Sequence, residues 1–314
     1  MKGSEAGFAG LLNSASKPRL LSGDATKESG VSFIYNLVPY VCKSSGAGSP
    51  NYQIPVSTAM AVFDELSTMA FIIEDANKRP GVSIHLEAKI CEKGKEITFP
   101  AVTNKDNNNS NSVSDEGIDV LVVTKMTKVG KTVGFCDISM LSMDGHTLLA
   151  HGSHIKFLPM GVIWDWLLGP TFLPYFIYFL DSVPLHFKAM LAPNFVHEGP
   201  PKIEKQSIFD EVNISEEGSF KVKPMLCNPI GALHGGALAI ACEEVVTRKA
   251  AKRKEAVSVS ELEIKYLRSM KGDIRVEISD DKDPDTVTTE GGKCHGVVKN
   301  KKNQLCAQFS ARLI

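Results

Sequence analysis

The sequence predicts a mixed α+β protein in which a long antiparallel sheet packs on a buried helix, an arrangement made twice along the chain. Two observations support this prediction. Segments 58–89 and 237–265 share one plan: an apolar helix, one acidic pair, a polar helix end and an alternating strand. Further segments with period-two alternation follow each of them, as expected for strands with one buried face. A mixture of this kind is typical of the α+β class.

The two repeated helices are apolar around most of their circumference, which predicts that they are buried on nearly all sides. Each helix carries one acidic pair, Asp64-Glu65 in the first and Glu243-Glu244 in the second. A carboxylate buried in this way is costly unless it is paired or used in chemistry. The acidic pairs are therefore the first candidates for a functional site.

The alternating segments define the expected strands. Turn signals, Val-Gly-Lys and Met-Asp-Gly-His, separate the last three strands of the first half. The predicted strands cover 82–90, 96–102, 118–127, 132–143 and 148–157 in the first half, and 220–225, 257–267, 273–278, 296–299 and 305–313 in the second.

The second repeated helix begins with an unusual turn, NPIGALHGG at 228–236. A His-Gly-Gly sequence at a helix start exposes backbone N–H groups that have no partner inside the helix, and glycine lets a ligand oxygen approach them closely. Such donors are suited to an oxyanion hole. A glycine pair before a helix is also a common turn, so the motif needs a second chemical group to be specific.

These motifs resemble the acyl-CoA thioesterases of the phenylacetyl-CoA type, including the animal thioesterase-superfamily enzymes, here arranged as a tandem double hotdog. The matching segments are NPIGALHGG at 228–236, DELSTMA at 64–70, GVS at 81–83 and AHGSHIKF at 150–157. The resemblance implies two sheets that each wrap a central helix and pack as a pseudo-dimer. It also implies hydrolysis of a fatty or aryl acyl-CoA to the free acid and CoA, with no metal and no cofactor beyond the CoA of the substrate.

The chain divides the family's site between its halves. An ungapped alignment of the two helices sets Pro55-Val56-Ser57 against His234-Gly235-Gly236, so the first half lacks the glycine pair. Glu243 follows His234 by nine positions on one helix, which is about 13 Å along the axis. One reaction centre cannot use both groups. The resemblance therefore implies that Asp64 of the facing helix is the acid and that Glu243 is a vestige.

The family's roles carry over as follows. The resemblance implies that Asp64 acts as nucleophile or general base and that the Gly235 N–H polarises the thioester carbonyl. It also implies that Asn228 holds water or substrate, that Ser83 positions it, and that His234 orients the turn. Simpler interpretations stay open for three of these residues: Asp64 as a buried carboxylate satisfied by a backbone donor, Ser83 as a structural hydroxyl, and Asn228 as a cap of its turn.

Three further residues, Gly236, His154 and Lys156, are candidates for substrate binding. His154 and Lys156 share one strand face and are expected to meet the nucleotide phosphates of CoA. The basic run at 248–254 is a second candidate for this contact. Its alternative interpretation is a solvated helix end, where cations suit the helix dipole. Nucleic acid is an unattractive partner, because 35 basic and 36 acidic residues leave a net charge of −1.

The segment 160–180 between the halves is apolar and rich in aromatic residues. Its length suggests a membrane span, but Asp165 and the Gly169-Pro170 break argue against a simple one. A flap that contacts a membrane surface or an acyl chain, and a packed connector, are the alternatives. The expected organisation is an N-terminal tail, disordered or targeting, at 1–31, hotdog domains at 32–159 and 204–314, and a connector at 160–203.

Composition bears on compartment and assembly. Seven cysteines without metal-ligand spacing indicate the reduced thiols of an intracellular protein, cytoplasmic or mitochondrial. The polar stretch 103–117 is expected to be disordered.

A homodimer of double hotdogs is a further possibility. Two other functions remain besides thioester hydrolysis: a non-catalytic acyl-CoA-binding or scaffold protein, and a hotdog dehydratase or hydratase.

Overall fold

The computed structural model describes residues 7–16, 18–21, 30–44, 51–79, 81–99, 117–158, 203, 205, 207–228, 231–252, 258–279 and 292–314. Within these ranges the chain forms an 11-stranded sheet and a 3-stranded sheet, and every strand pairing is antiparallel. The helices are α1 (Gly7–Ser16), α2 (Val56–Glu74), α6 (Ile208–Val212) and α7 (Gly235–Lys252), with 3-10 turns at Pro39–Val41, Glu92–Gly94 and Pro224–Leu226.

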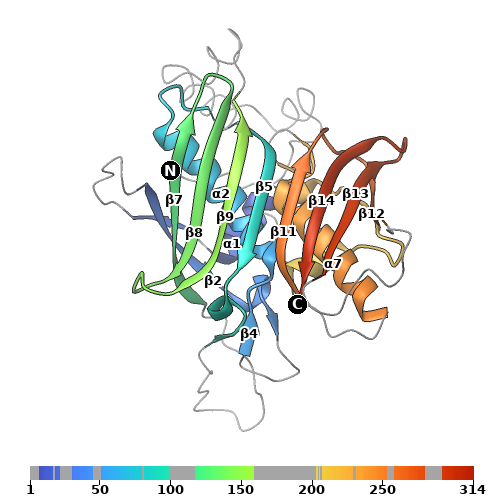
Figure 1. Cartoon of the computed structure of the whole chain (residues 1–314), viewed down its shortest axis with the longest axis horizontal. Coiled ribbons are helices and arrows are strands. Elements are labelled where there is room, and N and C mark those ends of the chain that lie inside the picture. Colours follow the sequence, from blue (N-terminus) through green and yellow to red (C-terminus); the bar gives the residue numbers. More distant parts are fainter. Residues whose placement is uncertain are drawn as a thin grey trace.

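The large sheet contains the strands of both halves in one continuous layer, with the order β1-β2-β7-β8-β9-β5-β11-β14-β13-β12-β10 (Figure 1). The small sheet has the order β3-β4-β6. The strands are β1 (Arg19–Leu20), β2 (Val31–Leu37), β3 (Lys43–Ser44), β4 (Asn51–Gln53), β5 (Val82–Ile90), β6 (Ile97–Thr98), β7 (Ile118–Val129), β8 (Val133–Ser142), β9 (Leu148–Phe157), β10 (Ser219–Lys221), β11 (Val259–Tyr266), β12 (Asp273–Ile278), β13 (Lys293–Asn300) and β14 (Leu305–Leu313).

The two halves meet where β5 pairs with β11. Glu87 lies opposite Glu263 in this pairing, and Leu86 lies opposite Ile264. In each half the strand at the junction is the one that follows the long helix, β5 after α2 and β11 after α7. The structure therefore confirms the internal repeat as two similar units of helix and sheet within one mixed α+β fold.

Helices α2 and α7 lie side by side on one face of the sheet and carry the centre of the core (Figure 1). Met60, Phe63 and Leu66 of α2 are fully buried, as the apolar circumference of this helix predicts. Helix α2 is also the one helix in the described ranges that is long and apolar enough to cross a membrane, but 72% of its apolar window is buried inside the protein. Its composition therefore fits a core helix.

Most predicted strands are found, four of them with the predicted bounds: 82–90, 148–157, 273–278 and 305–313. Two predictions were too long by several residues. The segment 220–225 is a strand only to Lys221, since Pro224 has no N–H for a ladder and begins a 3-10 turn. The segment 96–102 has strand structure only at Ile97–Thr98, and its residues 100–102 lie outside the described ranges.

The assignment of 1–31 to an N-terminal tail needs correction for Gly7–Ser16. These residues form α1, and Phe8, Leu11 and Leu12 are among the most deeply buried side chains. The Phe8 N–H also donates to the Cys227 carbonyl. The apolar residues share one face of this helix and complete the core. Strand β2, which the sequence reading missed, buries alternate residues from Val31 to Leu37.

Several expectations fall outside the described residues. These are the apolar segment 160–180, the connector 160–203 apart from Ile203, nearly all of the polar stretch 103–117, and the last two residues of the basic run at 248–254. The cysteines all lie in the described ranges, and all seven are unpaired thiols.

Candidate active site around Asp64

Asp64 lies in the middle of α2, where the helix passes the start of α7. Its side chain is only 5% exposed. The carboxylate oxygens point to different elements: Oδ1 faces β5 and β9, and Oδ2 faces the His234-Gly235 turn before α7. The sequence reading expected Asp64 to meet the glycine turn from the opposite helix, and this arrangement is found.

Gly235 leaves the space that the Asp64 carboxylate occupies. A Cβ atom on Gly235 would lie 2.5 Å from Asp64 Oδ2 and 2.9 Å from the Tyr266 hydroxyl oxygen, closer than real Cβ contacts. Gly235 is the first residue of α7, and no acceptor for its N–H is found among the described residues. The site therefore holds a buried carboxylate beside a helix N-terminus with an available donor.

His234 orients this turn. Its Nδ1 atom accepts a hydrogen bond from the Gly236 N–H at 3.0 Å, and its ring packs against Phe8 in a tilted arrangement with 5.1 Å between the ring centroids. Because Nδ1 accepts, it carries no proton, and its 3.4 Å approach to Asp64 Oδ2 is a contact rather than a hydrogen bond. The role of His234 in orienting the turn agrees with this geometry.

Gly236 does not fit its expected place among the substrate-binding residues. Its N–H is occupied by His234, and a Cβ atom there would lie 2.7 Å from the Cα of Ala61 and 2.6 Å from its Cβ. The missing side chain lets α7 cross α2 at close range. Gly236 is therefore a packing glycine, and Gly235 is the one beside the carboxylate.

Ser83 and His154 form a hydrogen-bonded chain that ends on Asp64. The Ser83 hydroxyl donates to Asp64 Oδ1 at 3.0 Å, and His154 Nε2 lies 2.9 Å from the Ser83 oxygen. His154 Nδ1 lies 2.6 Å from the Ser67 hydroxyl oxygen. The single proton of Ser83 goes to the carboxylate, so His154 donates to the Ser83 oxygen through Nε2, while the Ser67 hydroxyl also donates to the Phe63 carbonyl. Ser83 thus positions Asp64 itself.

Lys156 and His154 cannot meet CoA phosphates as expected, because both face inward. They are 2% and 0% exposed, and Lys156 Nζ lies 4.0 Å from Asp64 Oδ1. Burial, and next the nearby Lys156 charge, lower the pKa of His154 to about 3, so this imidazole stays neutral. The shared strand face was predicted correctly, but it is the inner face.

The charge state of Asp64 follows from its neighbours. Burial acts to raise the pKa of this carboxyl group, but the attraction of His234, Lys156 and His154 and the Ser83 hydrogen bond outweigh it and hold the pKa below its usual range. Burial is also the largest influence on the adjacent Glu65, but there the attraction of His234 and the hydrogen bond from Asn13 do not outweigh it, so the pKa of Glu65 is raised. The acidic pair therefore divides into an ionised Asp64 and a Glu65 for which protonation is easier.

Asn228 is not brought into contact with Asp64 by any described interaction. Its side-chain oxygen accepts from the Ala232 N–H at 3.0 Å, and its carbonyl accepts from the Gly231 N–H at 2.9 Å. These bonds shape the turn that leads to His234. The geometry agrees with the simpler interpretation of Asn228 as a turn residue, and it gives no support to the holding of water or substrate.

Glu243 on α7 occupies the position that corresponds to Asp64 on α2, but its carboxylate already has a hydrogen-bond donor and a cationic partner. Glu243 Oε2 accepts the backbone N–H of Ser57 at 2.8 Å, which is the position aligned with Gly236. Lys43 pairs with Glu243 at 3.3 Å and with Glu244 at 2.9 Å. Proline at 55 offers no side-chain acceptor, so the helix N–H goes to the acid. This second acid is already satisfied by a backbone donor and a cation.

Residues that the sequence reading missed complete the surroundings of Asp64. The Tyr266 hydroxyl donates to the Gly235 carbonyl at 3.3 Å, and Asn13 of α1 donates to Glu65 at 3.4 Å. Burial, and next the Asp64 charge, raise the pKa of Tyr266, so its phenol stays protonated. Tyr266 is brought to Gly235 by the packing of β11 against α7. No short motif signals such a contact.

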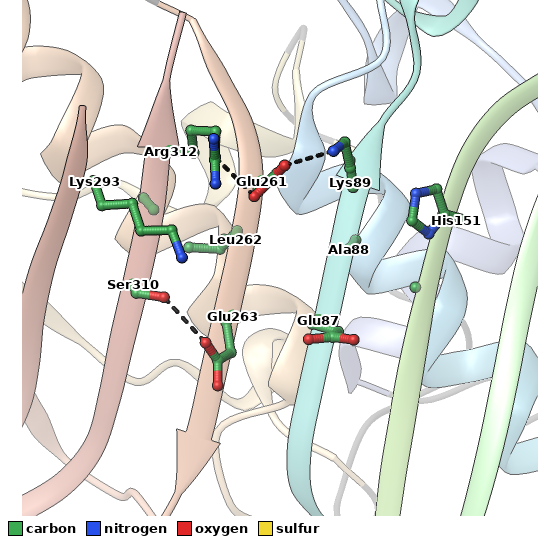
Figure 2. A pocket seen from close by; sticks show the side chains of 12 residues that line it. Glu87, Ala88, Lys89, His151, Glu261, Leu262, Glu263, Lys293, Ser310 and Arg312 are labelled. Carbon is green, nitrogen blue, oxygen red and sulfur yellow. Dashed lines mark hydrogen bonds and ion pairs between the residues drawn. The ribbon is translucent and has the colours of Figure 1, made fainter. Parts of the chain in front are cut away.

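A separate hollow of about 250 Å³ lies over the β5–β11 junction on the face of the sheet opposite the helices (Figure 2). Its charged side chains largely satisfy one another: Glu261 pairs with Lys89 at 2.7 Å and with Arg312 at 2.9 Å, and Ser310 donates to Glu263. It shares no residue with the surroundings of Asp64.

In the described ranges no group of three or more His, Cys, Asp or Glu residues is placed to hold a metal ion.

No protein-family model and no curated protein matches this sequence. Solved structures do match. The 12:0-ACP thioesterase from Umbellularia californica aligns with a TM-score of 0.51 at 10% identity, covering 90% of this chain and 96% of that chain. A protein from Novosphingobium aromaticivorans titled "putative thioesterase" also aligns with a TM-score of 0.51 at 10% identity, covering 94% and 97%. At this identity the likeness shows a common fold.

Proposed function

We propose that this chain is a thioester hydrolase: a double-hotdog acyl-CoA thioesterase with one composite active site. The observation that carries the proposal is the approach of Asp64 on α2 to Gly235 at the N-terminus of α7. This approach places the ionised Asp64 carboxylate beside the Gly235 N–H, for which no described residue supplies an acceptor. The similarity in fold to structures named as thioesterases, and the motifs shared with the phenylacetyl-CoA type, support the same chemistry.

In the proposed reaction, the Gly235 N–H and the positive end of the α7 dipole bind the thioester oxygen as negative charge develops on it. Asp64 either removes a proton from the water that attacks the thioester carbon, after which the carbon–sulfur bond breaks and the thiol leaves with that proton, or attacks the carbon itself, displacing the thiolate and forming an anhydride that water then hydrolyses. Ser83 fixes the orientation of the carboxylate through its 3.0 Å bond to Oδ1. A preorganised oxyanion donor is worth about 2.7–4 kcal/mol, and general-base assistance about 100- to 10,000-fold.

The second site is proposed to be silent. Glu243 is held by the Ser57 N–H and by Lys43, so a substrate oxygen would have to displace an existing hydrogen bond to use that donor. His234 prevents the same capture in the first site, because its Nδ1 atom takes the Gly236 N–H. In the aligned turns histidine replaces proline and the glycine pair replaces Val56-Ser57, so the first site keeps the Gly235 N–H without a described acceptor, whereas the Ser57 N–H of the second is occupied.

The test is turnover of a panel of thioesters by the wild-type chain, with the released thiol detected directly. The panel should contain short, long and aryl acyl-CoAs together with acyl-ACPs, because a structural neighbour is a 12:0-ACP thioesterase. Release of CoA above the rate without protein is the expected result. Saturable binding of acyl-CoA without release of thiol would instead identify a binding protein and overturn the proposal.

A further inference from the structure

Lys156 is a buried lysine whose only ion-pair partner among the described residues is Asp64. Burial lowers the pKa of its ammonium group, and the Asp64 carboxylate is the largest influence that acts against this. Its side chain is 3% exposed, and Nζ lies 4.0 Å from Asp64 Oδ1. This distance is too long for a hydrogen bond, and no acceptor for the ammonium group is found in the described part of the chain. Strand β9 thus places the Lys156 amine in the core, where it interacts with the Asp64 carboxylate through charge rather than through a hydrogen bond.

His234 and His154 also help to lower the pKa of Asp64, but their hydrogen bonds direct no imidazole proton at the carboxylate. His154 is neutral at ordinary pH because it is completely buried, and its Nε2 proton goes to Ser83. His234 accepts through Nδ1, which faces Asp64, so its ring presents a lone pair to the carboxylate rather than a proton. The titratable groups that face Asp64 or Lys156 are Glu65 on α2, His234 before α7, His154 on β9, Tyr266 on β11 and Cys136 on β8.

We propose that Lys156 is the counter-ion of Asp64: a positioning residue that keeps the carboxylate ionised in a site closed to bulk water. This inference rests on the proposed function, because it assigns Lys156 to the same reaction. A buried carboxyl group without a counter-ion favours its neutral form, which can neither attack a thioester nor accept a proton from water. Lys156 therefore acts on the reaction through Asp64.

The first test is the dependence of kcat/KM on pH in K156M. Removing a neighbouring opposite charge raises the pKa of a carboxyl group by about 1–3 units. We expect the acid limb of the K156M profile to move to higher pH by about that amount, with activity recovering toward the wild-type value above the new limb. K156R keeps the charge and should keep the limb near its wild-type position.

The chain supplies a matched control in its second half. Lys43 is paired with Glu243 at 3.3 Å, in the site proposed to be silent. K43M removes an equivalent cation and should leave the acid limb unchanged. An acid limb of K156M that coincides with that of the wild type would overturn the counter-ion role. If K156M does not fold, K156Q provides a second neutral variant for the same comparison.

A second measurement does not depend on turnover. In K156M the pKa of Asp64 should exceed that of the unfolded chain, so the folded state should lose stability relative to wild type as pH rises through the raised value. This relative loss should disappear in the double variant D64N/K156M. If the pH dependence of the stability difference is lost in D64N/K156M, the result supports the interaction of Lys156 with Asp64 even if no thioester is hydrolysed. A pH dependence that persists without Asp64 would contradict it.

Discussion

The Oδ2 atom of Asp64 lies 2.5 Å from the point where a side chain on Gly235 would begin, although the two residues belong to different helices and are far apart in the sequence. Neighbouring Gly236 meets a different obstacle, the backbone of Ala61. The two adjacent positions therefore require glycine for separate physical reasons. One leaves room for a carboxylate, and the other leaves room for a helix.

This difference predicts opposite effects of two alanine substitutions. G235A should fold, because its methyl group meets the end of a side chain, but it should displace Asp64 and reduce kcat by about 100-fold or more. G236A should overpack the crossing of α2 and α7 and lower the free energy of unfolding by about 1–3 kcal/mol. Kinetics and thermal unfolding of both variants check the prediction. Full activity in G235A would show that Asp64 and Gly235 do not act together.

Removal of the Ser83 hydroxyl should weaken catalysis without unfolding the protein. S83A removes the donor to Asp64 Oδ1 and the acceptor for His154. A hydrogen bond to a charged group contributes about 1.5–3 kcal/mol, so kcat should fall roughly 10- to 100-fold. S153A, on neighbouring β9, removes a hydroxyl that bonds Glu87 and should change kcat little. Equal losses in the two variants would point to a general effect on the sheet.

The sequence could predict the two core helices and the meeting of Asp64 with the glycine turn. Both follow from periodicity and from the internal repeat, which are properties of contiguous segments. The inward direction of Lys156 could not be predicted from alternation. Alternation shows that His154 and Lys156 share a face, but a polar pair on a strand ordinarily faces water. Only the carboxylate on the adjacent helix makes the inner face acceptable for a lysine.

Tyr266 and α1 illustrate two other reasons for failure. Tyr266 reaches Gly235 because β11 packs against α7, and this packing is a tertiary property. Helix α1 was missed although Phe8, Leu11 and Leu12 have helical spacing. Its surroundings of serine and glycine suggested a tail. Its position against Cys227 and His234 places it close to the site.

His154 should make stability depend on pH in a defined direction. Its pKa is about 3 in the folded protein, against an ordinary value of 6.5. Between these values the unfolded chain binds more protons, so the free energy of unfolding should decrease as pH falls below 6.5, by up to about 1.4 kcal/mol per unit. H154Q should remove this part of the slope in thermal unfolding. H151Q, an exposed neighbour on β9, should retain it, and equal slopes in H154Q and wild type would refute the neutral buried imidazole.

Parallel kinetics of D64N and E243Q test the single composite site most directly. Both substitutions replace a buried helix carboxylate with its amide, at aligned positions of the two halves, so each controls for the other. D64N should lower kcat by about 100- to 10,000-fold, the range for loss of a general base. E243Q should keep most of the wild-type kcat, since its acid is engaged by Ser57 and Lys43. A loss of about half the activity in each variant would instead demonstrate two working sites and contradict the composite one.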